Sequence, residues 1–269
     1  MLWSNYYPLI FFWKFVPFLM NLIAQNIVTL LGSELIHGIT VKDTVIMDSN
    51  MSFTILYAGC FIIEVCWFYN FWGEAKEWRR DGWNYLKDPW NYLDLSITIL
   101  TQVYMGQFMS DLWFERGIFS VTAIRTMGGM VVFLLWIKMF YWLRLFSSTA
   151  YFIKLILNTI FDLRNFFILI LIIMASFITM FYVFQQNLKG VVNDKGEQVR
   201  YIDEHTGYQL IDAILTIYFI MVGEFYTEDF KHGPNFVIIW PMFLVCNFLM
   251  AIVFMNMLIA IMSQTFTEV

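Results

Sequence analysis

Long apolar runs separated by shorter polar segments dominate the chain. A helix needs about 20 mostly apolar residues to cross a bilayer. Six runs come close to that length or exceed it, and they occupy residues 7–31, 52–72, 90–109, 127–146, 166–186 and 236–262. The pattern therefore predicts an all-α membrane protein with six transmembrane helices. A charge-dense segment at 73–88 is expected to form a polar hinge between the second and third spans.

Residues 147–165 follow a different, amphipathic pattern. Phe152, Ile156 and Ile160 share one face of a helix with this period, whereas Lys154 and Asn158 fall on the other face. We expect a linker helix here, between the fourth and fifth spans.

The segment from Leu210 to Val222 is apolar but too short to cross a membrane. It ends at Gly223, and Glu224 follows directly. A helix that ends at membrane depth must turn its terminal backbone groups toward protein or a water-filled path, because lipid cannot hydrogen-bond them. This segment therefore predicts a re-entrant helix beside a hydrated path. One chain cannot enclose such a path, so we expect it on the axis of an oligomer.

The order of these segments predicts three parts. Residues 1–146 would form a voltage-sensor-like bundle of four transmembrane helices, and 147–163 the linker helix. Residues 164–269 would form a pore domain made of the fifth span, a pore helix with its filter, and the sixth span.

Composition agrees with a membrane protein and excludes several other classes. Hydrophobic residues make up 60% of the 269 residues and charged residues only 14%, against roughly a quarter in a soluble domain. The net charge of −5 and the lack of a basic patch argue against nucleic-acid binding. The three cysteines lie inside apolar runs, where neither a disulfide framework nor a metal-ligand spacing is expected. The sequence shows neither a nucleophile–base pair nor a phosphate-binding loop, so no motif in it indicates an enzyme.

Four motifs resemble one family of channels. They are DPWNYLDLSI at the start of the third span, FLLWIKMF in the fourth, VGEF after the short helix, and NMLIAIMSQTFTEV at the end of the sixth. In this order they resemble the transient receptor potential (TRP) superfamily of six-transmembrane cation channels, between the polycystins and the vanilloid and ankyrin branches. The resemblance implies a homo- or heterotetramer of like subunits in contact with membrane lipids. It also implies a non-selective, calcium-permeable pore in a plasma or ciliary membrane, with an organelle membrane as the alternative.

The turn after the short helix is the candidate selectivity filter. Several copies of Glu224 around an axis would form the carboxylate ring that cation channels use, with Gly223 and Val222 offering carbonyl groups to the permeating cations. Between residues 187 and 234 we count eight acids against four bases, which would concentrate cations at the mouth. The alternative is an ordinary solvated loop.

The last span carries the candidate gate. Asn247 and Asn256 are nine residues apart, which places them on opposite faces of an ideal helix. We assign Asn256 and Ile252 to the pore-lining stripe and Asn247 to helix packing. By resemblance the constriction is Ile259, with Ile261 or Met262 close behind it if the helix changes register. The alternative for the whole stripe is simple helix packing.

The first four spans hold few charges. Lys138 and Arg144 lie on different faces of the fourth span, so strong voltage sensing is not expected. Glu64, Asn91 and Asp94 could converge in the bundle. In some TRP branches such groups bind a regulatory Ca²⁺, although only the N-x-x-D half of that motif matches here. The reading that we favour is an ion pair of Lys138 with Asp94 or Glu64, so no metal site is firmly assigned and no other cofactor is expected.

Basic residues set the expected orientation. Seven lie in the 73–88 hinge and around the linker, which places these segments in the cytoplasm and the turn at Glu224 on the other side. The sequence thus predicts a passively conducting pore subunit. A non-conducting structural subunit that keeps the channel fold is the alternative.

Overall fold

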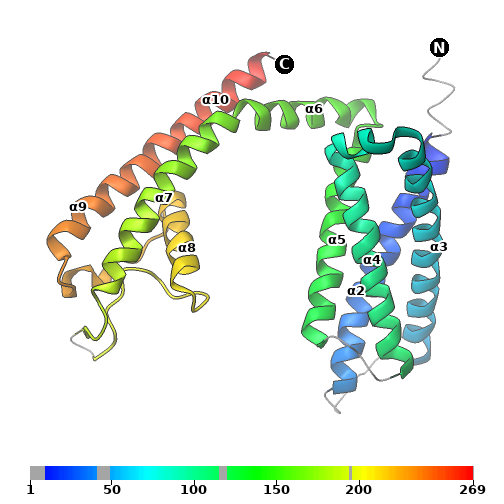
Figure 1. The fold of residues 1–269 in the computed structure, drawn as a ribbon, viewed down its shortest axis with the longest axis horizontal. Helices are drawn as coiled ribbons and strands as arrows, with labels where there is room; N and C mark the ends of the chain where they lie inside the picture. The colour runs from blue at the N-terminus through cyan, green and yellow to red at the C-terminus, as the bar shows by residue number, and fades with distance from the viewer. Residues whose placement is uncertain (1–9, 41–48, 115–119, 194–195, 269) are drawn as a thin grey trace. The chain divides into compact units, whose positions relative to one another are not determined.

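The computed structural model describes residues 10–40, 49–114, 120–193 and 196–268. It divides into two compact units, residues 1–153 and 154–269, each of which is described by itself (Figure 1). Within the described ranges nearly every regular element is a helix, apart from one isolated bridge between Val192 and Gln198.

The first unit is a four-helix bundle. Its elements are η1 (Phe11–Phe15), α2 (Val16–Thr40), α3 (Ser49–Asp81), η2 (Gly82–Lys87), α4 (Pro89–Phe114) and α5 (Val121–Leu143). Helix α2 packs against α3 and α5, and α4 packs against α3 and α5, so the four helices close into a ring around one core. Side chains in that core include Phe18, Val28, Leu56, Ile63, Met105, Val131 and Leu135.

The predicted polar hinge at 73–88 is wrong in its first half, because α3 continues without interruption to Asp81. Ala75, Lys76 and Glu77 are good helix formers, so the helix continues past Gly73. The chain turns only in η2, a 3₁₀ helix of six residues.

The second unit is built around a short helix. Its elements are the second half of α6 (Ser147–Asp162), then α7 (Arg164–Gln186), α8 (Gln209–Val222), η3 (Glu228–His232), α9 (Phe236–Asn247), η4 (Phe248–Phe254) and α10 (Met255–Glu268). Helix α8 packs against α7, α9 and η4, and α9, η4 and α10 continue as one helical rod. The core of this unit includes Phe177, Phe181, Ile217, Ile220, Phe230, Ile239, Phe243 and Cys246.

The last span is not the uniform helix that the sequence predicted. Pro241 lies inside α9, and the seven residues of η4 form a π-helix. A π-helix bonds each residue to the fifth one along instead of the fourth, so side chains beyond it are rotated relative to a continuous α-helix. The ideal-helix argument that put Asn247 and Asn256 on opposite faces therefore does not hold across this segment.

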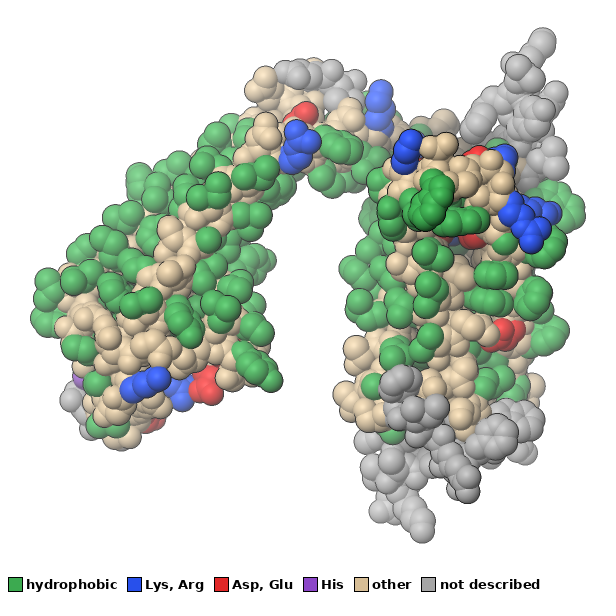
Figure 2. Space-filling model, viewed as in Figure 1, with side chains coloured by type: hydrophobic (Ala, Val, Ile, Leu, Met, Phe, Trp, Pro, Cys, Tyr) green, Lys and Arg blue, Asp and Glu red, His purple; other side chains and the backbone are tan. Residues whose placement is uncertain are grey.

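Both units carry apolar side chains on their outside as well as in their cores. Phe61, Phe68 and Phe133 are exposed on the first unit, and Leu171 and Ile172 on the second. Figure 2 shows hydrophobic side chains over much of the visible surface of each unit. A water-facing protein rarely exposes apolar patches this extensive, so these surfaces are suited to lipid or to other subunits.

Five helical stretches among the described residues are long and apolar enough to span a membrane: Phe11–Gly32, Phe53–Lys87, Val121–Leu143, Arg164–Gln186 and Phe236–Thr267. Helix α4 has 26 residues but carries more polar side chains, and it completes the bundle between α3 and α5. The 14 residues of α8 are too few to cross. The predicted fold class is confirmed: six membrane helices, four in a bundle and two that flank a re-entrant helix.

A pair of adjacent glycines tests how tightly the bundle packs. A Cβ on Gly128 would lie 2.8 Å from Tyr104 Cε2 and 3.0 Å from Thr29 Cγ2, whereas a Cβ on Gly129 would meet nothing within 4 Å. We expect Gly128→Leu to destabilise the protein by about 1–3 kcal/mol through overpacking, and Gly129→Leu to leave stability nearly unchanged. Thermal unfolding of the two variants in the same detergent checks this. Equal losses of stability would contradict the packing.

Candidate functional site

The turn after α8 is shaped by Gly223. This residue has φ +89°, a left-handed conformation that glycine adopts without strain. The N–H of Gly223 donates to Ile220 O at 3.1 Å, and the N–H of Glu224 donates to Phe219 O at 2.8 Å. These two bonds satisfy carbonyls at the end of the helix and place Glu224 just beyond it. Val222, Gly223 and Glu224 are all exposed within the single chain.

Buried polar side chains of α7, α8 and η3 hold the loop that precedes α8. Gln185 Oε1 accepts the N–H groups of Tyr201 at 2.7 Å and Ile202 at 3.2 Å. Asp212 Oδ1 accepts the N–H of Thr206 at 2.8 Å, and Asp229 Oδ2 accepts the N–H of Arg200 at 3.1 Å. Three elements of the second unit therefore hold this loop in place.

The same hydrogen bonds correct the charge count made from the sequence. Asp212 is 3% exposed and Asp229 is 6% exposed, because their carboxylates accept backbone hydrogen bonds. They do not face water as vestibule charges. Glu197, Glu204, Glu224 and Glu228 are exposed and Asp203 is half-buried, whereas Asp194 lies outside the described residues.

The candidate pore-lining residues lie on a face of the last span that its own chain leaves open. Ile252 is 51% exposed and Ile259 is 62% exposed, and Asn256 is exposed beside them. The Asn256 amide donates to Ile252 O at 2.7 Å along the same helix. The two alternative gate residues differ from these: Ile261 and Met262 are half-buried and pack against the core of the second unit.

A polar contact links the end of the last span to the linker helix. The Thr265 hydroxyl lies 3.2 Å from Asp162 Oδ2 and 3.1 Å from Ile261 O, and Thr265 is buried. Sequence analysis did not find this pair, because the two residues are 103 positions apart and neither belongs to a motif.

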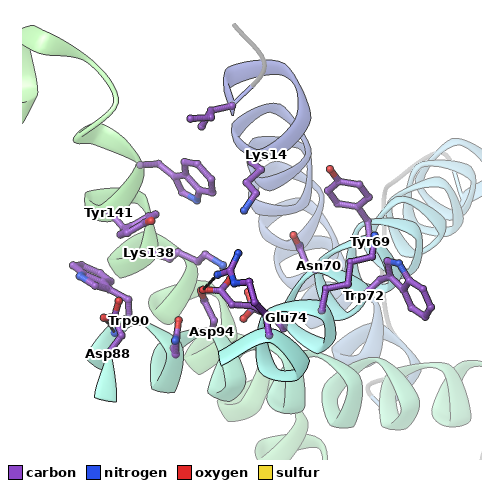
Figure 3. A pocket seen from close by; sticks show the side chains of 17 residues that line it. Lys14, Tyr69, Asn70, Trp72, Glu74, Asp88, Trp90, Asp94, Lys138 and Tyr141 are labelled. Carbon is purple, nitrogen blue, oxygen red and sulfur yellow. Dashed lines mark hydrogen bonds and ion pairs between the residues drawn. The ribbon is translucent and has the colours of Figure 1, made fainter. Parts of the chain in front are cut away.

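A cavity of about 640 Å³ opens at one end of the four-helix bundle (Figure 3). Lys138 forms an ion pair with Asp94 there, and its ammonium group also lies 5.9 Å from the centre of the Phe18 ring. The Asn91 amide, at the same cavity, donates to Tyr85 O at 2.7 Å. Figure 3 shows Lys138 and Asp94 pointing toward one another, with Glu74 nearby.

Glu64 does not join this group. It is not among the residues that line the cavity, and Glu74 on the same helix lies there instead. Ten residues of α-helix separate the two by about 15 Å. Glu74 accepts a hydrogen bond from the Tyr85 hydroxyl at 2.6 Å. Sequence analysis missed Glu74 because it placed that residue in a polar hinge instead of a helix.

Two residues of this cavity, Asn91 and Asp94, are candidate ligands of the expected regulatory calcium ion. In the ranges that the structure describes, no three His, Cys, Asp or Glu side chains are grouped so that they could hold a metal ion. Asp94 already has the Lys138 ammonium as its cation. Calcium there would have to displace this lysine.

We expect Lys138→Met to be strongly destabilising. Lys138 and Asp94 have side chains only 13% and 17% exposed, so removing Lys138 leaves the nearly buried Asp94 carboxylate without its ion-pair partner. Such a loss costs about 3–5 kcal/mol. The double variant Lys138→Met, Asp94→Leu should recover much of the loss, as measured by thermal unfolding in detergent. No recovery in the double variant would contradict the pairing.

Four spans in a bundle, followed by two spans that flank a re-entrant helix, define the class of membrane ion channels. The family model for ion transport proteins matches residues 4–269, and the chain belongs to the ion transport protein family. This is a family of channels and not of enzymes. A comparison with curated proteins gave no match.

Proposed function

We propose that the chain is the pore-forming subunit of a tetrameric cation channel of the TRP type. The observation that carries this proposal is the exposed turn at Gly223 and Glu224, on the end of a helix too short to cross the membrane. Four such turns around an axis would bring four carboxylates to one narrow passage.

In this proposal cations pass by passive conduction, without any chemical reaction on the protein. Cations gather at the acidic mouth, pass the carbonyl groups of Val222 and Gly223 and the Glu224 ring, and enter the path lined by Ile252 and Asn256. The open face of the last span supports this assignment, because polar Asn256 at membrane depth favours a hydrated surface over lipid. Closure at Ile259 would occur by dewetting of an apolar ring.

The proposal includes three further features: permeation by calcium, membership of the TRP type, and regulation of the channel by calcium. A dense ring of carboxylates attracts divalent ions more strongly than monovalent ones. The motifs DPWNYLDLSI, FLLWIKMF and NMLIAIMSQTFTEV support the TRP type. A regulatory Ca²⁺ at Asn91 and Asp94 is part of this proposal by resemblance, and it would have to displace Lys138 from its ion pair with Asp94.

Reconstitution tests the proposal. The purified protein in liposomes should pass Na⁺, K⁺ and Ca²⁺ but not Cl⁻, and its mass in nanodiscs should correspond to four chains. A protein that is folded and monomeric and passes no ions would instead support the alternative, a structural subunit that keeps the channel fold.

A further inference from the structure

Several polar atoms in the core of the four-helix bundle are buried without a partner. Asn21 on α2 is 4% exposed and Thr101 on α4 is 1% exposed, and within the described ranges neither Asn21 Oδ1 nor Thr101 Oγ1 has a hydrogen-bond partner. Gln25, one turn further along α2, is fully buried, and both atoms of its amide also lack a partner there. An unpaired polar atom in an apolar core is unfavourable, so this polar interior requires an explanation.

The Thr101 hydroxyl differs from those of other threonines in helices. The hydroxyls of Thr98, Thr126 and Thr159 each donate to the backbone carbonyl four residues earlier, at 2.8, 2.8 and 2.9 Å. This bond is open to any threonine inside a helix. Thr101 lies on the same helix as Thr98, yet its hydroxyl does not bond to Ile97 O. Its hydrogen-bonding capacity is therefore directed into the bundle.

A small cavity adjoins these atoms. Its volume is about 10 Å³, and its lining includes Asn21 of α2, Thr101 of α4 and Lys138 of α5. This is about the least space that one water molecule needs, and it is too small for a larger ligand. Lys138 and Asp94 line both this cavity and the cavity of about 640 Å³ in Figure 3. The ion pair therefore borders both spaces.

The groups around the small cavity match the bonding capacity of one water molecule. The ammonium group of Lys138 has three N–H donors, and its ion pair with Asp94 does not use all of them. A water molecule there can accept from Lys138 and from the Thr101 hydroxyl, and it can donate to Asn21 Oδ1 and to the Asp94 carboxylate. Four bonds use its full capacity. A metal cation fits less well, because the positive charge of Lys138 lines the same cavity.

We propose that the four-helix bundle binds an internal water molecule between Asn21, Thr101 and the ion pair of Lys138 with Asp94. The water joins α2 to α4, which lie diagonally across the ring of helices, and joins both to α5. It also gives the ion pair a further polar partner at membrane depth. The inference goes beyond the proposed function and does not depend on it, because the site lies in the bundle and not in the pore.

Thermal unfolding of the full chain in detergent tests the site. If the cavity were dry, Asn21→Leu would remove an unpaired polar atom and raise the melting temperature. The bound water predicts the opposite, a fall of at least about 3 °C, because the water loses an acceptor that holds it in place. Once the water is lost, Thr101 has no partner to lose, so Asn21→Leu with Thr101→Val should cost no more than about two thirds of the sum of the single losses.

The matched control is Thr159→Val. Thr159 is also buried in a helix, but its hydroxyl bonds to Leu155 O of its own helix and it belongs to the second unit. Its loss should therefore add in full to that of Asn21→Leu. A higher melting temperature for Asn21→Leu, or simple addition of Asn21→Leu and Thr101→Val, would overturn the inference.

A second measurement needs no variant. An experimental structure of the wild-type protein in nanodiscs, at a resolution that shows ordered water, should have density within hydrogen-bonding distance of both Asn21 Oδ1 and Thr101 Oγ1. A cavity without density, or a Thr101 hydroxyl bonded to Ile97 O, would contradict the site even if the variants fail to fold.

Discussion

Glu224→Gln should lower the single-channel conductance for cations about two- to tenfold and weaken the preference for Ca²⁺ over Na⁺. The substitution removes one negative charge per subunit at the proposed filter while it keeps the size of the side chain. The backbone turn should survive, because Gly223 and the bond from the Glu224 N–H to Phe219 O do not involve the carboxylate. Bilayer recordings at low and high salt would measure both effects.

The matched control is Glu228→Gln. Glu228 is an exposed acid at the start of η3, four residues after Glu224, and it does not cap α8. Its removal should change the conductance only slightly, and mainly at low salt, where remote charges are screened least. If Glu228→Gln alters selectivity and Glu224→Gln does not, the filter assignment is wrong.

Ile259→Asn should produce a cation leak at rest at least about tenfold above that of the wild type. A hydrophobic constriction excludes ions because water leaves it, and an amide ring would keep it wet. The folded chain should tolerate the change, because Ile259 is 62% exposed and packs little against its own subunit. Flux of a monovalent cation from liposomes measures the leak.

Two other substitutions locate the gate. Met257→Asn changes a side chain that is 45% exposed two positions away, on a different side of α10, and should cause no leak. Ile261→Asn alters a residue that packs against the core, so it should reduce thermal stability without raising the resting leak. A leak in Met257→Asn or Ile261→Asn, with none in Ile259→Asn, would place the constriction elsewhere.

The apolar runs predicted the fold well because membrane helices are set by local composition. Each span needs only enough consecutive apolar residues, and the short run before Gly223 was recognised as re-entrant by its length alone. The prediction of a hinge at 73–88 was wrong for a related reason. Hydropathy shows where an apolar run ends, but the helix itself can continue beyond the membrane into water. The π-segment Phe248–Phe254 has no signature in the apolar pattern.

The site was harder to predict where long-range hydrogen bonds decide it. From the sequence, Asp212 and Asp229 are expected to be vestibule acids. In the folded chain they are buried and accept backbone hydrogen bonds from the loop before α8, in the case of Asp229 from a residue 29 positions away. Glu74 was overlooked and Glu64 chosen, because both are acids on one long helix and only its packing shows which one reaches the cavity. The pairing of Lys138 with Asp94 could be proposed from the sequence, since a charge at membrane depth requires a partner.

Recordings from mixed subunits test the central claim most directly. Wild-type and Glu224→Gln chains would be combined at varied ratios before reconstitution, and the single-channel conductances sorted into classes. Four chains that share one axial filter predict about five classes, with intermediate conductances between the two pure channels and frequencies that follow the mixing ratio. If only the two parental conductances appear at every ratio, Glu224 from different chains does not share a pore, and the tetrameric account is wrong.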